Sequence, residues 1–271
     1  MDRIELVGKI GSMALIDRDD IDYNKIARIG RRLKPGTVWV TSGAAEIGRL
    51  DFIRRNGREA EGDGDEIKSD YAAQGQSLLM QTYRMFVDEK YSVRQLLVEH
   101  SHFNNFAKRE HIKNMLVRCA LQNAIPIVNY NDAVSMEETR KMEISRLKQQ
   151  RRPVVELVDN DETAGQIACL VHAKTLLILS TLDGIYYDMS DKGSLINEIS
   201  AVGAENTLAE IERVKSRCKG ASRAGANGAA AKLEYIKPCV AAGTKVIIAG
   251  ANYDIDAVLS GDAPATRIFV K

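Results

Sequence analysis

The sequence predicts an α/β fold, a three-layer αβα sandwich around a largely parallel central sheet. Short apolar runs of strand length alternate with segments of helical periodicity along all 271 residues. Turns built from small residues, such as Gly11-Ser12 and Ser42-Gly43, follow several of the apolar runs. The composition, 45% hydrophobic and 28% charged, is sufficient for a large core. Regular alternation of strands and helices is typical of a parallel sheet covered on both faces.

The first expected strand, 4–7, is a short apolar run that leads into a glycine- and serine-bearing turn at 8–12. Segment 154–158 is expected to return to the core. The later strands are expected at similar apolar runs, namely 37–41, 93–98, 125–129, 175–179, 245–249 and 266–270.

The expected helices have apolar residues at helical spacing: 22–33, 70–89, 109–123, 206–215, 229–240 and 254–259. A further helix is expected to open at Ser42-Gly43-Ala44-Ala45. Segment 54–68 is polar and glycine-bearing, which favours an exposed loop. Segment 137–152 is the most charged stretch and is predicted to be a solvated helix or hairpin arm, because acidic and basic residues are mixed and aromatic residues are absent.

Several classes of function are disfavoured. The net charge of +1 gives no strong field for nucleic acid or anionic membranes, and no apolar run approaches the ~20 residues of a membrane helix. The N-terminus lacks the layout of a signal peptide. His100-Ser101-His102 is interpreted as a polar strand end rather than a metal site. Free, buried thiols in a cytoplasmic protein are expected from the widely spaced cysteines, Cys119, Cys169, Cys218 and Cys239.

A polar cluster at 159–161 (Asp-Asn-Asp) opens a helical pattern, which is followed by the apolar strand at 175–179 and a turn at 181–184. Polar groups at a helix start beside a buried strand are typical of ligand sites in α/β enzymes. Lys9 ends the first apolar run, where a charge is costly without a partner or ligand. Lys232 lies just inside a helix that a glycine-rich loop begins.

These features suit phosphoryl transfer, which requires cations around the transferred group and rigid positioning rather than covalent help from the protein. The small-residue turns could supply backbone N–H groups to phosphates. Neither a Walker A loop nor a GxGxxG turn after the first strand is present. Taken singly, each turn also fits ordinary turn chemistry, and Lys232 fits a solvated helix lysine.

Seven short segments occur in a characteristic order along the chain: 9–12 (KIGS), 40–44 (VTSGA), 72–76 (AAQGQ), 126–134 (PIVNYNDAV), 158–165 (VDNDETAG), 183–186 (DGIY) and 225–232 (GANGAAAK). They resemble the motifs of the amino acid kinase family in that family's order, the last one more loosely, and most closely those of its glutamate 5-kinase branch.

The resemblance implies a single amino acid kinase domain over 1–271, with an acceptor-binding lobe near 1–152 and a nucleotide-binding lobe near 153–271. It implies ATP-dependent phosphorylation of the side-chain carboxylate of L-glutamate, the first step of proline biosynthesis. ATP is the implied co-substrate, with Mg²⁺ held mainly by its phosphates and no metal site built from protein side chains. A homo-oligomer, dimer or tetramer, is also implied. Many members carry a C-terminal PUA domain, for which this sequence leaves no room after Lys271.

Residue roles follow from the same resemblance. Lys9 and Lys232 are expected to stabilise the transferring phosphoryl group, and Asp161 to hold both lysines. The residues expected at the acceptor are Ser42, Gly43, Asn129, Asn131, Asp132 and Asn160. Those expected at the nucleotide are Lys9, Gly11, Ser12, Ser180, Thr181, Asp183, Gly228 and Lys232. Asp132 also has a chemical reason of its own, because a carboxylate can bind the α-ammonium group of an amino acid.

The sequence departs from the family pattern at several positions. Thr181 replaces an aspartate, Tyr130 replaces a glutamate beside the acceptor, and Asn227 and Ala229 change the late loop. Roughly fifteen residues near 139–157 are inserted between the two acceptor motifs. Two alternatives therefore stay open: a family member with another acceptor (N-acetylglutamate, aspartate, UMP or an isoprenoid phosphate), and a nucleotide-binding homologue with weak catalysis.

Overall fold

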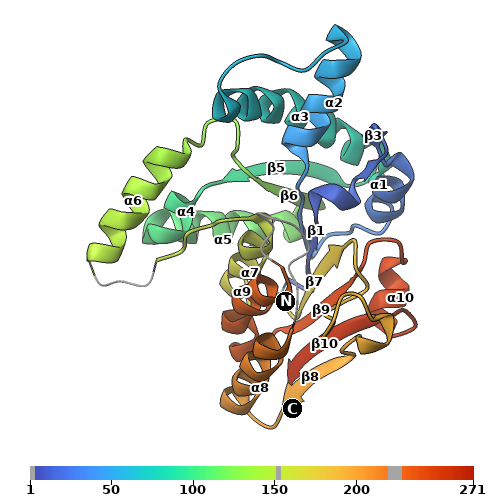
Figure 1. Cartoon of the computed structure of the whole chain (residues 1–271), viewed down its shortest axis with the longest axis vertical. Helices are drawn as coiled ribbons and strands as arrows, with labels where there is room; N and C mark the ends of the chain where they lie inside the picture. Colours follow the sequence, from blue (N-terminus) through green and yellow to red (C-terminus); the bar gives the residue numbers. More distant parts are fainter. Residues whose placement is uncertain (1–3, 151–153, 219–227) are drawn as a thin grey trace.

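A computed structural model describes residues 4–150, 154–218 and 228–271 of the protein (Figure 1). The strands are β1 (Leu6–Ile10), β2 (Ile16–Asp17), β3 (Asp20–Ile21), β4 (Thr37–Val40), β5 (Ser92–Val98), β6 (Ala124–Tyr130), β7 (Thr175–Ser180), β8 (Glu198–Ala201), β9 (Lys245–Gly250) and β10 (Ala265–Val270). The α-helices are α1 (Tyr23–Gly30), α2 (Ala44–Asn56), α3 (Gly64–Phe86), α4 (His100–Asn104), α5 (Phe106–Leu121), α6 (Glu137–Gln149), α7 (Asn160–Leu170), α8 (Ala204–Arg217), α9 (Ala229–Ala241) and α10 (Ile255–Ser260). Short 3₁₀ helices are η1 (Ser12–Ala14) and η2 (Lys192–Ser194).

One eight-stranded sheet runs through the molecule in the order β5-β6-β4-β1-β7-β9-β10-β8. Neighbouring strands in it are parallel except β9 and β10, which are antiparallel. The chain leaves β1 towards β4 on one side, whereas β7 lies on the other side. Such a change of direction opens a crevice at the carboxyl ends of the strands. The largely parallel sheet predicted from the sequence is confirmed.

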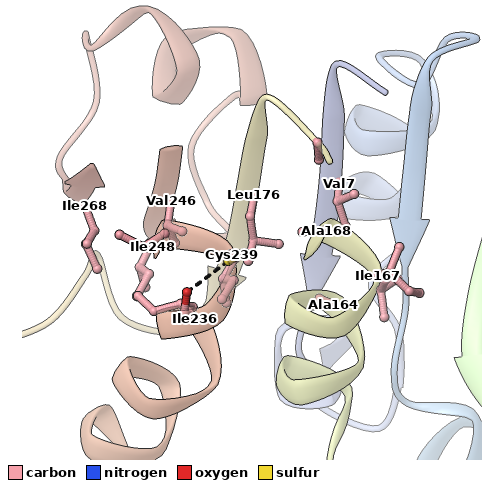
Figure 2. Close-up of a cluster of buried hydrophobic side chains, with 14 of the residues drawn as sticks. Val7, Ala164, Ile167, Ala168, Leu176, Ile236, Cys239, Val246, Ile248 and Ile268 are labelled. Carbon is pink, nitrogen blue, oxygen red and sulfur yellow. Dashed lines mark hydrogen bonds between the residues drawn. The ribbon is translucent and has the colours of Figure 1, made fainter. Parts of the chain in front are cut away.

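Helices cover both faces of the sheet, which gives the predicted three layers. On one face, strand residues such as Val7, Leu176 and Val246 pack against α7 and α9, as Figure 2 shows. On the other face, Trp39, Leu177 and their neighbours pack against α1, α2, α3 and α10. Adjacent residues of one strand, such as Leu176 and Leu177, therefore enter different cores, because side chains alternate across a strand. This explains why the strands appear in the sequence as continuous apolar runs.

Glycines let two helix pairs approach closely. A Cβ added to Gly75 of α3 would lie 1.9 Å from the carbonyl oxygen of Ala44 in α2, and one on Gly48 would lie 1.8 Å from the carbonyl oxygen of Tyr71. A Cβ on Gly165 of α7 would lie 2.7 Å from the carbonyl oxygen of Tyr235 in α9. The first contact sets the position of α3 and the second sets the spacing of α7 and α9, both of which contribute to the site described below.

Some sequence predictions were wrong. Segment 54–68 is not one exposed loop: α2 extends to Asn56 and α3 begins at Gly64 after an N-cap by Asp63, whose side chain accepts hydrogen bonds from Asp65 N and Glu66 N. The histidine pair is not a strand end, since His100 begins α4. Lys9 lies within β1 rather than in a turn, because pairing with β4 and β7 continues through it. Strands β2, β3 and β8 were not expected.

The charged arm is a helix, α6, which lies beside α4 and away from the sheet in Figure 1. Segment 154–158 forms no strand, although Leu157 is buried and Val155 exchanges two backbone hydrogen bonds with the Asn104 side chain. Cys119 and Cys239 are buried thiols and Cys169 and Cys218 are partly buried. No helix of the described chain has the length and apolar character needed to cross a bilayer.

Candidate active site

A cavity of about 610 Å³ opens at the carboxyl ends of β1, β4, β6 and β7. Each of these strands is followed by short polar residues at the cavity wall, because parallel strands end at the same edge of a sheet. The N-terminal turns of α7 and α9 also reach the cavity, through Asn160 and Lys232. Helix N-termini carry unpaired backbone N–H groups and a partial positive charge, which favour anions.

Asp161 joins two lysines at the centre of this wall. Its Oδ1 lies 2.5 Å from Lys9 Nζ, and its Oδ2 accepts a hydrogen bond of 2.5 Å from Lys232 Nζ. Burial of Asp161, which is 4% exposed, would raise its pKa, but the two ammonium groups outweigh burial and lower that pKa to about 2. The carboxylate is therefore ionised at neutral pH. It also holds two ammonium groups side by side at the cavity, where burying either of them without a partner would cost free energy.

Local sequence explains why α7 places Asp161 there. The N-cap Asp159 accepts hydrogen bonds from the backbone N–H groups of Asp161 and Glu162. Glu162 in turn accepts one from Val158 N, close to the geometry of a capping box. These hydrogen bonds fix the first turn of α7, and Asp161 faces the sheet. Lys9 reaches it from β1, on the strand face shared with Val7, which packs against α7 (Figure 2).

A network of amide side chains links α7, β6 and α3 beside the cavity. Asn160 Nδ2 donates to Ser42 Oγ (3.1 Å) and to Asn129 Oδ1 (3.0 Å). Asn129 Nδ2 donates to Gln76 Oε1 on α3 (2.8 Å), and Asn129 Oδ1 also accepts from Tyr130 N. Asn160 Oδ1 is buried and has no hydrogen-bond partner in the described structure. An unpaired buried acceptor is costly unless a ligand donor reaches it.

Asp132 is another carboxylate of this wall. Burial raises its pKa above the ordinary value of 3.8, and the nearby Lys68, with Nζ 3.6 Å from Asp132 Oδ1, opposes that shift. The backbone carbonyl oxygen of Asp132 accepts a hydrogen bond from Ser69 Oγ, so the first turns of α3 hold this loop. The Lys68 side chain is largely exposed and reaches in from solvent.

The cavity is also lined by Gly11, Ser12, Gly43, Ser180 and Thr181. Gly43 begins α2 with φ +94°, a left-handed conformation that favours glycine. A second cavity of about 90 Å³ adjoins the first, sharing Ser180, Thr181 and Lys232. Its other lining residues are mostly apolar: Leu182, Gly184, Ile185, Tyr186, Met189, Gly228 and Ala229.

Most residues singled out in the sequence line one of these cavities, and three do not. Asn129 is 1% exposed and lies behind the wall, where its Oδ1 accepts two hydrogen bonds and its Nδ2 donates one. Asn131 donates to Glu99 Oε1 instead. Asp183 lies beside Tyr253, whose pKa is raised by desolvation and by that carboxylate. Of the late loop, 225–227, including Asn227, lies outside the described residues.

Other residues of the wall were missed. They come from the first turns of α3 and α6 and from the loop before α6: Asp65, Lys68, Ser69, Ser135, Glu137 and Arg140. The polar character of 54–68 and 137–152 indicated solvent exposure, and nothing local distinguishes a helix end that faces water from one that faces a ligand cavity. Within the described ranges, no three side chains of His, Cys, Asp or Glu gather as metal ligands would.

Solved structures of similar shape define the class. Carbamate kinase from Giardia lamblia bound to AMP-PNP superposes with a TM-score of 0.62 at 16% identity, covering 99% of both chains. UMP kinase from Ureaplasma parvum gives a TM-score of 0.54 at 12% identity, covering 100% of this chain and 99% of the other. The fold is therefore that of the amino acid kinases.

The sequence places the chain more closely. The profile of the amino acid kinase family matches residues 5–250, and the chain belongs to that family. It is similar to glutamate 5-kinase 1 of Bacillus licheniformis (29% identical, covering 99% of this chain and 70% of the relative) and to glutamate 5-kinase of Clostridium perfringens (28% identical, covering 100% and 97%). Membership of this kinase family supports a phosphotransferase activity.

Proposed function

We propose that the protein transfers the γ-phosphoryl group of ATP to the side-chain carboxylate of L-glutamate, which would form L-glutamyl 5-phosphate for proline biosynthesis. The observation that carries the proposal is the buried Lys9–Asp161–Lys232 arrangement in a cavity that is also lined by Asp132 and Asn160. The glutamate 5-kinases among the relatives support the choice of acceptor.

In this reaction a carboxylate oxygen attacks the γ-phosphorus as the bond to the bridging oxygen of ADP breaks. The acceptor is already ionised and requires no general base, which agrees with a role of Asp161 in holding lysines rather than moving protons. Lys9 and Lys232 would stabilise charge on the transferred group. Mg²⁺ would arrive on the phosphates of ATP, since both oxygens of Asp161 already face lysines.

The two cavities divide the substrates between them. The phosphates would lie against the backbone of Gly11, Ser12 and Gly43, and the nucleobase in the apolar second cavity between Tyr186 and Ala229. The α-ammonium group of glutamate would replace Lys68 at Asp132. The unpaired Asn160 Oδ1 offers a second acceptor nearby. Asn129 would position Asn160 rather than touch the acceptor.

The assay is release of ADP and trapping of the acyl phosphate with hydroxylamine, in the presence of glutamate, ATP and Mg²⁺. Replacing a group that stabilises transition-state charge lowers kcat by about 10²–10³-fold, and we expect this for Lys232→Ala. Lys237→Ala is the matched control, a lysine of the same helix that pairs with Glu212 and Glu234 away from the cavity. Turnover that Lys232→Ala leaves unchanged would contradict the assigned role.

A family member with a different acceptor is the second candidate, because Tyr130, Ser135 and Glu137 contribute unexpected side chains to the acceptor wall. The ligand that raises the Tm of the protein distinguishes a glutamate acceptor from a different acceptor. The proposal expects L-glutamate to raise Tm and UMP to leave it unchanged, whereas the reverse pattern would favour a nucleotide acceptor.

A further inference from the structure

The charged helix α6 contributes to the acceptor side of the cavity through its first turn. Glu137 and Arg140 line the cavity together with Ser135, which precedes the helix, and with Tyr130 and Asp132. The rest of α6 extends away beside α4, as Figure 1 shows. His100 Nε2 and Glu143 Oε2, 2.8 Å apart, connect the two helices. One end of the helix that the sequence predicted to be a solvated arm therefore faces the ligand site.

Arg140 is held rigidly there. Its Nε and Nη2 donate to the two carboxylate oxygens of Glu137 at 2.9 and 2.8 Å, and its Nη1 donates to Glu156 O at 3.1 Å. The side chain is only 13% exposed. A guanidinium group has five N–H donors, so about two remain for a ligand after these three bonds. Because Glu137 and Glu156 already order the guanidinium group, its remaining N–H groups would lose little conformational freedom on binding a carboxylate.

Tyr130 lines the same cavity as Asp132 and Arg140. Its hydroxyl hydrogen-bonds with Ser135 Oγ at 2.8 Å. Burial raises the pKa of Tyr130, the Ser135 hydrogen bond and the Arg140 guanidinium lower it, and the Glu99 and Asp132 carboxylates raise it. The cavity wall thus carries an anion, Asp132, and a cation, Arg140, together with one aromatic ring.

We propose that Arg140 binds the α-carboxylate of the acceptor while Asp132 binds its α-ammonium group, so that the pair selects α-amino acids. The inference rests on the proposed function and narrows it to a zwitterionic acceptor. A carboxylate matches the planar fork of arginine, and the opposite charges of an α-amino acid match the opposite charges on the wall. Arg146 on the same helix provides a contrast, because its side chain is exposed and forms no ion pair or hydrogen bond with any described residue.

The test compares Arg140→Gln with Arg146→Gln in the full chain, using L-glutamate and 4-aminobutyrate, which lacks the α-carboxylate. We expect Arg140→Gln to raise KM for L-glutamate by about ten- to a hundredfold, the usual effect of losing a hydrogen bond to a charged group. KM for ATP should stay within twofold of wild type. The preference of kcat/KM for L-glutamate over 4-aminobutyrate should fall by a similar factor, since the discriminating contact is gone. Arg146→Gln should behave as wild type.

Arg140→Lys keeps the charge without the fork and should give an intermediate KM for L-glutamate; Tm of each variant shows whether it folds. A preference for L-glutamate retained in Arg140→Gln, whether activity falls or not, would overturn the inference and leave Arg140 a structural residue of the α6 turn. If the wild-type protein phosphorylates no L-glutamate, the proposed function itself is contradicted. The inference about Arg140 is then contradicted as well, because it rests on that function.

Discussion

Replacing Asp161 by Asn removes the charge that compensates two lysines. Lys9 is 7% exposed and Lys232 is only partly exposed, so neither ammonium group regains full hydration after the change. The amide keeps the shape of the side chain and can still bond to one lysine. The expected effect is therefore electrostatic rather than steric, and it should appear both in stability and in phosphoryl transfer.

The size of the effect follows from two estimates. The pKa of Asp161 falls from 3.8 to about 2, and at ~1.36 kcal/mol per unit this is on the order of 2 kcal/mol of stability. Breaking a buried pair by removing one partner costs about 3–5 kcal/mol, because the other charge stays buried. We expect the free energy of unfolding to fall by roughly 2–5 kcal/mol at pH 7. Changing Lys9 to Met as well should restore most of this loss but no activity.

The stability that Asp161 contributes should decrease as the pH falls. Asp161 has a depressed pKa in the folded protein, so its contribution is complete above its ordinary pKa of 3.8 and is lost as pH falls through about 2. The Asp161→Asn variant should lack this component of acid unfolding.

Urea unfolding can be followed by the fluorescence of Trp39, which is the single tryptophan of the chain, is fully buried and is hydrogen-bonded to Tyr83. Glu5→Gln is the control, since the exposed Glu5–Lys174 pair should contribute no more than about 1 kcal/mol. If Asp161→Asn is no less stable than Glu5→Gln, or transfers phosphate at the wild-type rate, the reasoning about the buried lysines is refuted.

Two further perturbations test the wall of the site. Gly75→Ala would place a Cβ 1.9 Å from Ala44 O, and we expect the free energy of unfolding to fall by about 1–3 kcal/mol or more. Gly64→Ala is the control and should change stability little, because the space around Gly64 is open. Equal Tm values for the two variants would contradict the close contact between α2 and α3. Burial raises the pKa of Asp132, so KM for L-glutamate should rise as pH falls towards that pKa while KM for ATP stays constant. Asp132→Asn should remove this pH dependence, and a wild-type profile in that variant would exclude Asp132 as the ammonium ligand.

Much of the fold follows from short-range patterns. The apolar runs of β4, β6, β7 and β9 are nearly continuous because both faces of these strands are buried, and this made them recognisable. The polar cluster at 159–161 marked the start of α7 correctly, since Asp159 is its N-cap. By contrast, β8 and its parallel pairing with β10 gave no such signal, because β8 is short and partly exposed at the sheet edge.

The sequence by itself determined the alternation of strands and helices, the family motifs and the candidates Lys9, Asp161 and Lys232. Those signals lie in neighbouring residues and in side-chain chemistry. Only the tertiary structure decided that the three charged groups meet, that Asn129 hydrogen-bonds to Asn160 from behind the cavity wall, and that Arg140 of a charged helix lines the same cavity. The physical reason is that ion pairs, burial and pKa depend on distances between residues far apart in the chain, which no local pattern specifies.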